Sequence, residues 1–149
     1  MYQQFRSATQ EDVDYILELE ALPQSRFVHG NDRAGHVANL NDSTMQYFIA
    51  EDINANRLGF ALLHEEEDGT LEWRRIIIEA TGGGIGRAFM VALIKRFDAN
   101  SVPKIWLDVY EQNIKPQRLY QSLGFVVTKR IPYEGEPKGT LVIMERAHP

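Results

Sequence analysis

Apolar residues recur at helical spacing near the start of the chain. Val13 and Ile16 follow this spacing behind Thr9, a residue type that caps helix N-termini, with Asp12 at the third position after it. The pattern predicts a short N-terminal strand and then a helix that ends near residue 22, just before a proline.

The periodicity is poor across residues 24–43. Glycines and asparagines interrupt a short amphipathic stretch around His36, Val37 and Leu40. We therefore expect a connection that lies on the surface and contains only a short second helix.

Three runs rich in β-branched and aromatic residues come next, at residues 45–51, 58–64 and 71–78. Residues 54–56 and the acidic, glycine-containing segment 65–69 separate them. Such spacing of strand-like runs and turn-like residues predicts an antiparallel meander.

The second half of the chain alternates between helical and strand patterns. Residues 87–97 are too apolar for a lone surface helix and fit one that packs on a sheet. A second helix is predicted where a proline suits the first turn and Gly124 suits the C-terminal cap. This second helix covers residues 116–123, and strands are predicted at residues 104–109, 125–131 and 140–145. The fold class is therefore α+β (mixed α/β), a mixed sheet covered by helices.

Composition and charge narrow the function classes. A chain of 149 residues predicts one domain, residues 1–149, and the net charge of -5 argues against nucleic acid or an anionic membrane as the main partner. A basic partner or a small amine fits this charge better. Without cysteine there is no disulfide, no cysteine-containing zinc site and no cysteine nucleophile. The N-terminus has no apolar run, so a cytoplasmic location is expected.

A glycine-rich turn carries the clearest chemical signal. The strand ending in Ile76, Ile77 and Ile78 leads through Gly82, Gly83, Gly84, Ile85 and Gly86 directly into a helix that begins with Arg87. Glycines let successive backbone N–H groups converge on an anion, and the helix adds the positive end of its dipole. The turn predicts a phosphate or pyrophosphate site, to which Arg87 adds a charge. The alternative is a turn that only tightens the packing of strand against helix.

Spacing excludes two common nucleotide motifs. A dinucleotide fingerprint that starts at Gly82 or Gly84 needs a third glycine at position 87 or 89, and these positions hold Arg87 and Phe89. A nucleoside triphosphate loop needs Gly-Lys-Ser or Gly-Lys-Thr, and the chain contains neither.

The remaining pattern resembles the acetyl-CoA loop of the GNAT superfamily of N-acetyltransferases. That loop reads Gln or Arg, two residues, Gly, one residue, Gly or Ala, and it falls here on Thr81, Gly84 and Gly86. Thr81 departs from the usual long polar residue, so a side-chain contact to the pyrophosphate is missing from the pattern. A second family motif follows, in which Asn113 precedes Tyr120 and then a Leu-Gly-Phe ending.

The resemblance implies a fold and a cofactor. The family fold is a mixed, mostly antiparallel sheet of about six to seven strands flanked by about four helices. Its fourth and fifth strands splay apart around acetyl-CoA, the co-substrate, and the backbone of Ile76, Ile77 and Ile78 would pair with the pantetheine. A homodimer is common in such proteins.

Acetyl transfer needs a base and an acid, because an alkylamine has a pKa of roughly 10.4 and must lose a proton before it attacks. Tyr120 matches the family tyrosine that protonates the leaving thiolate. Asp108 and Glu72 are the candidate bases, and Asn113 would tie the end of the fifth strand to the cofactor or to the next helix. The alternatives are a packing tyrosine, a salt-bridged or rim aspartate, a solvated glutamate and an N-cap asparagine.

The sequence predicts an N-acetyltransferase that moves the acetyl group directly to a primary amine of a small molecule or protein. No metal site is expected, since the histidines lack ligand spacing. Two rival interpretations are a non-catalytic regulator that binds acyl-CoA and a purely structural module. In the family, the segment over residues 24–43, which holds His29 and His36, often lines the acceptor pocket.

Overall fold

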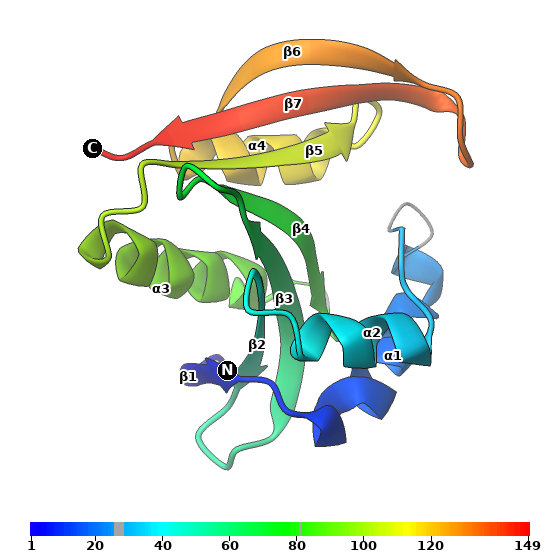
Figure 1. Ribbon diagram of the computed structural model, residues 1–149, viewed down its shortest axis with the longest axis vertical. Coiled ribbons are helices and arrows are strands. Elements are labelled where there is room, and N and C mark those ends of the chain that lie inside the picture. The colour runs from blue at the N-terminus through cyan, green and yellow to red at the C-terminus, as the bar shows by residue number, and fades with distance from the viewer. Residues whose placement is uncertain (26–28, 81) are drawn as a thin grey trace.

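One seven-stranded sheet forms the centre of the computed structural model, which describes residues 1–25, 29–80 and 82–149. The strand order is β1-β2-β3-β4-β5-β7-β6 (Figure 1). The elements are β1 (Gln4–Ser7), α1 (Val13–Glu20), α2 (Arg33–Leu40), β2 (Met45–Glu51), β3 (Arg57–Glu65), β4 (Leu71–Ile78), α3 (Ile85–Ala99), β5 (Lys104–Tyr110), α4 (Ile114–Ser122), β6 (Val126–Tyr133) and β7 (Gly139–Ala147).

The predicted fold class and order of elements are confirmed. β2 and β4 have the predicted bounds, and Gly124 takes the predicted left-handed conformation after α4, with φ of 97°. α3 starts at Ile85, two residues earlier than predicted, because Gly84 already serves as its N-cap. α2 is better defined than its weak periodicity indicated, because the Asp32 side chain accepts a hydrogen bond from the Gly35 N–H at 2.8 Å.

The sheet has one weak seam, between β4 and β5. Every other neighbouring pair of strands is antiparallel, whereas β4 and β5 are parallel and share only the pairs Leu71 with Ile105 and Glu72 with Trp106. Beyond Glu72 the two strands diverge, which confirms the predicted splay (Figure 1). A bulge at Arg74, where Leu62 pairs with Arg75 and Leu63 with Trp73, interrupts β4 just past this point.

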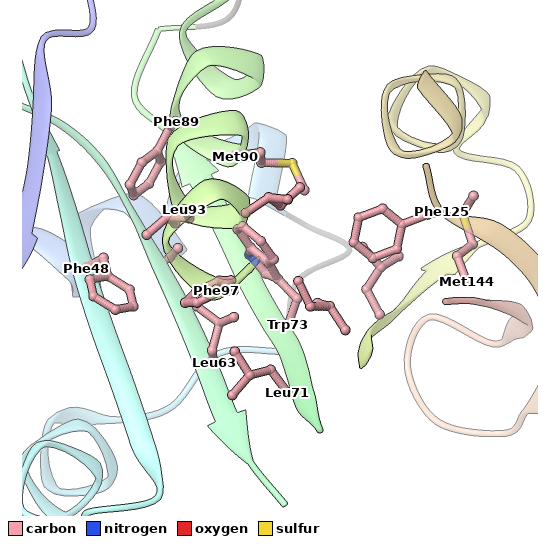
Figure 2. Close-up of a cluster of buried hydrophobic side chains, with 14 of the residues drawn as sticks. Phe48, Leu63, Leu71, Trp73, Phe89, Met90, Leu93, Phe97, Phe125 and Met144 are labelled. Atoms are coloured by element: carbon pink, nitrogen blue, oxygen red, sulfur yellow. The ribbon is translucent and has the colours of Figure 1, made fainter. Parts of the chain in front are cut away.

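Two hydrophobic clusters hold the helices to the two faces of the sheet. α1 packs on one face, where Ile16 and Leu19 meet Phe60 and Ile77. On the other face, α3 packs its apolar stripe against strands from both sides of the seam, and Figure 2 shows the buried side chains. The larger residues of this second cluster are Phe48, Leu63, Trp73, Phe89, Leu93, Phe97, Phe125 and Met144. Since this cluster draws on β2, β3, β4, β5 and β7, side-chain packing joins the arms that hydrogen bonds leave apart. In the described part of the chain, no helix is long and apolar enough to span a bilayer.

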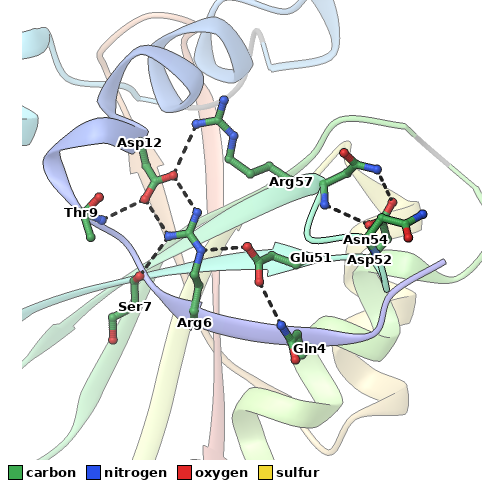
Figure 3. A network of polar contacts seen from close by, with 10 residues as sticks. Gln4, Arg6, Ser7, Thr9, Asp12, Glu51, Asp52, Asn54 and Arg57 are labelled. Atoms are coloured by element: carbon green, nitrogen blue, oxygen red, sulfur yellow. Dashed lines mark hydrogen bonds and ion pairs between the residues drawn. The ribbon is translucent and has the colours of Figure 1, made fainter.

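A buried ionic network fastens the N-terminal strand (Figure 3). Asp12 is only 2% exposed and accepts two hydrogen bonds from Arg6, at 2.8 and 3.0 Å, and one from the Thr9 N–H at 2.9 Å. Arg57 contacts the same carboxylate at 3.4 Å, and Arg6 also pairs with Glu51 at 2.8 Å. Burial alone would raise the pKa of Asp12, but the hydrogen bonds from Arg6 and Thr9 hold it below its ordinary value.

Replacing Asp12 with alanine is expected to lower the free energy of unfolding by about 2 to 4 kcal/mol, because Arg6 loses its best partner and the Thr9 N–H loses its acceptor. This loss of unfolding free energy lies toward the lower end of what breaking a buried ion pair costs, because Arg6 is partly solvated. Asp14→Ala, two residues further along in α1, is the matched control, where an exposed pair with Arg33 should contribute less than about 1 kcal/mol. Urea denaturation measures both, and equal losses in the two variants would contradict this account.

Candidate active site

Three consecutive glycines form the turn between β4 and α3 with left-handed backbone angles. The φ values of Gly82, Gly83 and Gly84 are 86°, 70° and 73°, a conformation that residues with a Cβ rarely adopt. Apart from the glycine itself and its chain neighbours, no heavy atom of the described residues lies within 4 Å of a Cβ built at any of the three. The left-handed backbone angles therefore account for these glycines, tight packing does not, and the turn leaves an open surface. Thr81, the predicted motif position, lies outside the described residues.

The first turn of α3 leaves backbone donors at this surface. The first intrahelical hydrogen bond runs from the Ala88 N–H to the Gly84 carbonyl, at 3.0 Å. The N–H groups of Ile85, Gly86 and Arg87 therefore have no partner within the helix. Together with the positive end of the helix dipole, they suit an anion.

A pocket of about 460 Å³ opens beside this turn, and we call it the glycine-turn pocket. Its walls come from the second half of β4, the start of α3 and α4. The predicted cofactor residues that line it are Ile76, Ile77, Ile78, Gly82, Gly84, Gly86, Arg87 and Tyr120. Gly83 and Ile85 belong to the same turn without lining the pocket. Lys115, which the sequence reasoning did not select, adds a second cation to its wall.

A second pocket, of about 340 Å³, lies between the diverging strands, and we call it the β4–β5 pocket. Glu72, Asp108 and Asn113, all predicted site residues, line it. The residues that line both pockets are Gln24, Ile76, Pro116 and Tyr120. The two pockets therefore meet where β4 faces the start of α4, and a ligand in one can reach a ligand in the other.

Tyr120 stands at this junction. Its side chain is half-buried, and burial together with the negative charge of Asp108 raises its pKa to about 12. The phenol therefore keeps its proton at neutral pH. Among the described residues no hydrogen bond engages its hydroxyl, although its ring packs against Phe125 at 6.1 Å between centroids. The Tyr120 ring therefore packs as the alternative interpretation expects, while its hydroxyl is left without a hydrogen-bond partner among the described residues.

Asp108 faces the β4–β5 pocket from β5, between the buried residues Leu107 and Val109. The carboxylate is open to the pocket, yet the concave walls limit the water around it. Burial raises the pKa of Asp108 above its ordinary value, and the charge of Glu72 raises it further. No ion pair engages Asp108 in the described part of the chain. The salt-bridge alternative therefore finds no partner there, whereas the exposed position of Asp108 agrees with the rim alternative. A raised pKa makes Asp108 a better proton acceptor than an ordinary aspartate.

Glu72 is in a different state from Asp108. Its Oε1 atom lies 2.9 Å from Nε of Arg74 and 3.8 Å from Nδ1 of His64. The Glu72 carboxylate is therefore already engaged by a guanidinium, whereas Asp108 is not, and the negative charge of Glu72 acts on Asp108.

Asn113 and Arg87 lie at the two pockets and differ in whether their side chains are engaged by the protein. Asn113 occupies the N-cap position of α4, but its side chain makes no capping hydrogen bond and instead lines the β4–β5 pocket. Nη1 of Arg87 donates to Oγ of Ser122 at 2.5 Å, which ties the start of α3 to the end of α4 beside the glycine-turn pocket.

Sequence reasoning missed Gln24, which lies at the junction of the two pockets. Its Nε2 atom donates to the carbonyl oxygens of Ile78 and Glu79, at 3.3 Å each. The contact spans more than fifty residues of sequence, so no local pattern points to it. A glutamine after a proline reads only as a turn.

Comparison with known proteins identifies a family and a fold. The model described as "Acetyltransferase (GNAT) family" matches residues 11–125. A mutant of the spermidine N-acetyltransferase SpeG from Vibrio cholerae is similar in structure, with a TM-score of 0.84, 22% identity, and coverage of 98% of this chain and 95% of that chain. A chimera of that enzyme with hSSAT has a TM-score of 0.82, 22% identity, and coverage of 98% and 96%. At such identity the likeness shows the fold alone. A search of curated proteins gave no match.

The pKa of Asp108 is expected to fall in the variant Glu72→Gln, because that substitution removes a nearby negative charge and releases the guanidinium of Arg74. Carboxylate titration by NMR measures the change. Glu67→Gln, which removes an exposed carboxylate from the acidic turn before β4, is the matched control and should leave the value unaltered. An Asp108 pKa that is equal in the wild type and in Glu72→Gln would show that the two groups do not interact.

Proposed function

Because this chain belongs to the Acetyltransferase (GNAT) family and is therefore an acetyltransferase, we propose that it moves the acetyl group of acetyl-CoA directly to a primary amine. A single catalytic domain over residues 1–149 is part of this proposal. The observation that carries it is that two pockets meet at Tyr120. One pocket is lined by backbone N–H groups that suit a phosphate, and the other is lined by carboxylates.

The glycine-turn pocket fits the co-substrate. Its pyrophosphate would be held by the N–H groups of the turn and of the first turn of α3, with Arg87 and Lys115 as nearby cations. The pantetheine would lie along Ile76, Ile77 and Ile78, on the edge of β4 from which β5 has diverged. Binding of the pyrophosphate in the glycine-turn pocket would depend little on the side chain at position 81, because backbone groups supply most of the hydrogen-bond donors.

The β4–β5 pocket fits the acceptor and the proton transfers. Acetyl-CoA supplies a thioester, and Asp108 accepts the proton that the amine must lose before it attacks. A backbone N–H of β4 near Ile76 donates to the carbonyl oxygen as that oxygen gains charge. Tyr120, which is protonated at neutral pH, delivers a proton to the departing thiolate. Asn113 would orient the ligand at the end of β5.

The acceptor is an amine, in keeping with the net charge of -5 and with the carboxylates of the pocket. The similar solved structures are those of spermidine N-acetyltransferases, so spermidine is the first acceptor to test. A non-catalytic acyl-CoA-binding regulator is the alternative, and Tyr120 and Asp108 at the junction count against it. The cytoplasmic location and the homodimer stay predictions.

Replacing Tyr120 with phenylalanine is expected to lower kcat about 10²- to 10⁴-fold, because the ring still packs on Phe125 while the proton donor is lost. The KM for acetyl-CoA should change little. Release of free CoA in the presence of spermidine and other amines measures both quantities. Tyr2→Phe, at a tyrosine that packs on Phe89 away from the pockets, is the matched control.

One outcome would overturn the proposed acetyl transfer, and a second would overturn only the role of Tyr120. Acetyl-CoA that binds tightly to the wild type without release on any amine would favour the regulator. An unaltered kcat in Tyr120→Phe would remove the tyrosine from the chemistry while leaving acetyl transfer in place.

A further inference from the structure

The arginines that line the β4–β5 pocket are already neutralised by the protein. Nε of Arg74 lies 2.9 Å from Glu72, and Nη1 of Arg75 lies 3.1 Å from Glu20, a carboxylate brought in from α1. Arg75 is further held by a hydrogen bond of 2.5 Å to Asn31. Asp108 is left as the lining carboxylate without an ion pair among the described residues.

This distribution of charge discriminates between classes of amine. A ligand that carries one positive charge compensates Asp108 and relieves the repulsion between Asp108 and Glu72. A ligand with a carboxylate beside its amine brings a second negative charge and meets guanidiniums that are already committed to Glu72 and Glu20.

His29 and Tyr110 form an aromatic wall of the same pocket, and Tyr133 packs against both of these rings. The Tyr110 hydroxyl donates to the Pro137 carbonyl at 2.7 Å, so it accepts from Nε2 of His29, which lies 3.1 Å away. The His29 ring stacks on Tyr133, with 5.1 Å between centroids and an interplanar angle of 24°. Tyr110 stands edge-on to both rings. The imidazole is therefore fixed in orientation by three contacts.

The wall joins the two arms of the splayed sheet. His29 precedes α2, Tyr110 ends β5 and Tyr133 ends β6, so segments from opposite sides of the seam meet at the mouth of the pocket. In Figure 1 the β6–β7 hairpin reaches toward the segment before α2 across the open end of the splay. The flat surface of the aromatic wall suits the hydrocarbon body of an amine whose nitrogen is directed to Asp108.

From these contacts we propose that the acceptor is a primary amine with an apolar body and no carboxylate next to the nitrogen, and that His29 is the residue that positions this body. The inference rests on the proposed function and deepens it by naming the acceptor class. It assigns to Arg74 and Arg75 a role in setting the charge of the pocket, with no contact to an acceptor carboxylate.

Three probes of nearly equal shape test the charge part of the proposal. Phenethylamine carries the amine alone, phenylalanine adds a carboxylate, and phenylalaninamide adds a neutral group of the same size. We expect kcat/KM for phenethylamine and phenylalaninamide to exceed that for phenylalanine by at least about tenfold, which corresponds to about 1.4 kcal/mol. Equal rejection of the amide and the acid would indicate exclusion by size, and preference for the acid would indicate a guanidinium free to bind it. Either result overturns the proposal.

Two variants test His29. His29→Ala should raise the KM for phenethylamine at least about fivefold while leaving the KM for acetyl-CoA within about twofold, since only the acceptor pocket contains His29. His29→Phe keeps a ring against Tyr133 and should restore part of the affinity. His148→Ala, at an exposed histidine near the C-terminus, is the control. KM values raised equally for both substrates, a lower kcat with a lower melting temperature and unchanged KM, or no change at all would each contradict the role of His29.

Calorimetric binding of the same three amines separates this inference from the proposed function. If phenethylamine binds the wild type, binds His29→Ala more weakly and is never acetylated, the acceptor class stands and the transfer reaction fails. If acetyl transfer occurs to phenylalanine in preference to phenethylamine, the proposed function stands and the acceptor class fails.

Discussion

The short pairing between β4 and β5 is the constraint on which the rest of the structure depends. Two residue pairs join the strands, and after Glu72 each strand follows its own arm of the sheet. Backbone groups along a strand need partners, so a sheet that opens in this way leaves an edge suited to a ligand with amide groups. The fold can sustain the opening because the large hydrophobic cluster, from α3 through Trp73 to Phe125, bridges the arms beneath it.

The opening also separates two environments that meet at Tyr120. On one side the glycine turn and the start of α3 present backbone N–H groups, and on the other Asp108 and Glu72 present negative charge. Burial and the charge of Asp108 raise the pKa of Tyr120 to about 12. Burial and the charge of Glu72 raise the pKa of Asp108 in the same region. The same small volume therefore favours a protonated phenol and a more basic carboxylate, which are the states that an acid and a base need at neutral pH.

The parts of this site that local sequence dictates could be predicted, and the parts made by long-range contacts could not. The glycine turn, β4 and Tyr120 follow from spacing and from turn residues, because each signal lies within a few positions of the chain. The family resemblance placed Gln24 and His29 only within a segment that often lines the acceptor pocket, and no local pattern selected either residue, since each acts through partners on β4 or β5 that are far away in sequence. The state of Glu72 depends on Arg74 and His64, so its pairing could not be deduced from a glutamate at the start of a strand.

The central claim is that acetyl-CoA takes the place of the strand pairing that β4 lacks beyond Glu72. Amide hydrogen exchange with and without acetyl-CoA tests this claim most directly. Binding should slow exchange at Ile76, Ile77 and Ile78 and at the first amides of α3. Exchange at Leu71 and Glu72, which already pair with β5, should change little. Acetyl-CoA binding that leaves the second half of β4 and the glycine turn unprotected would contradict the account.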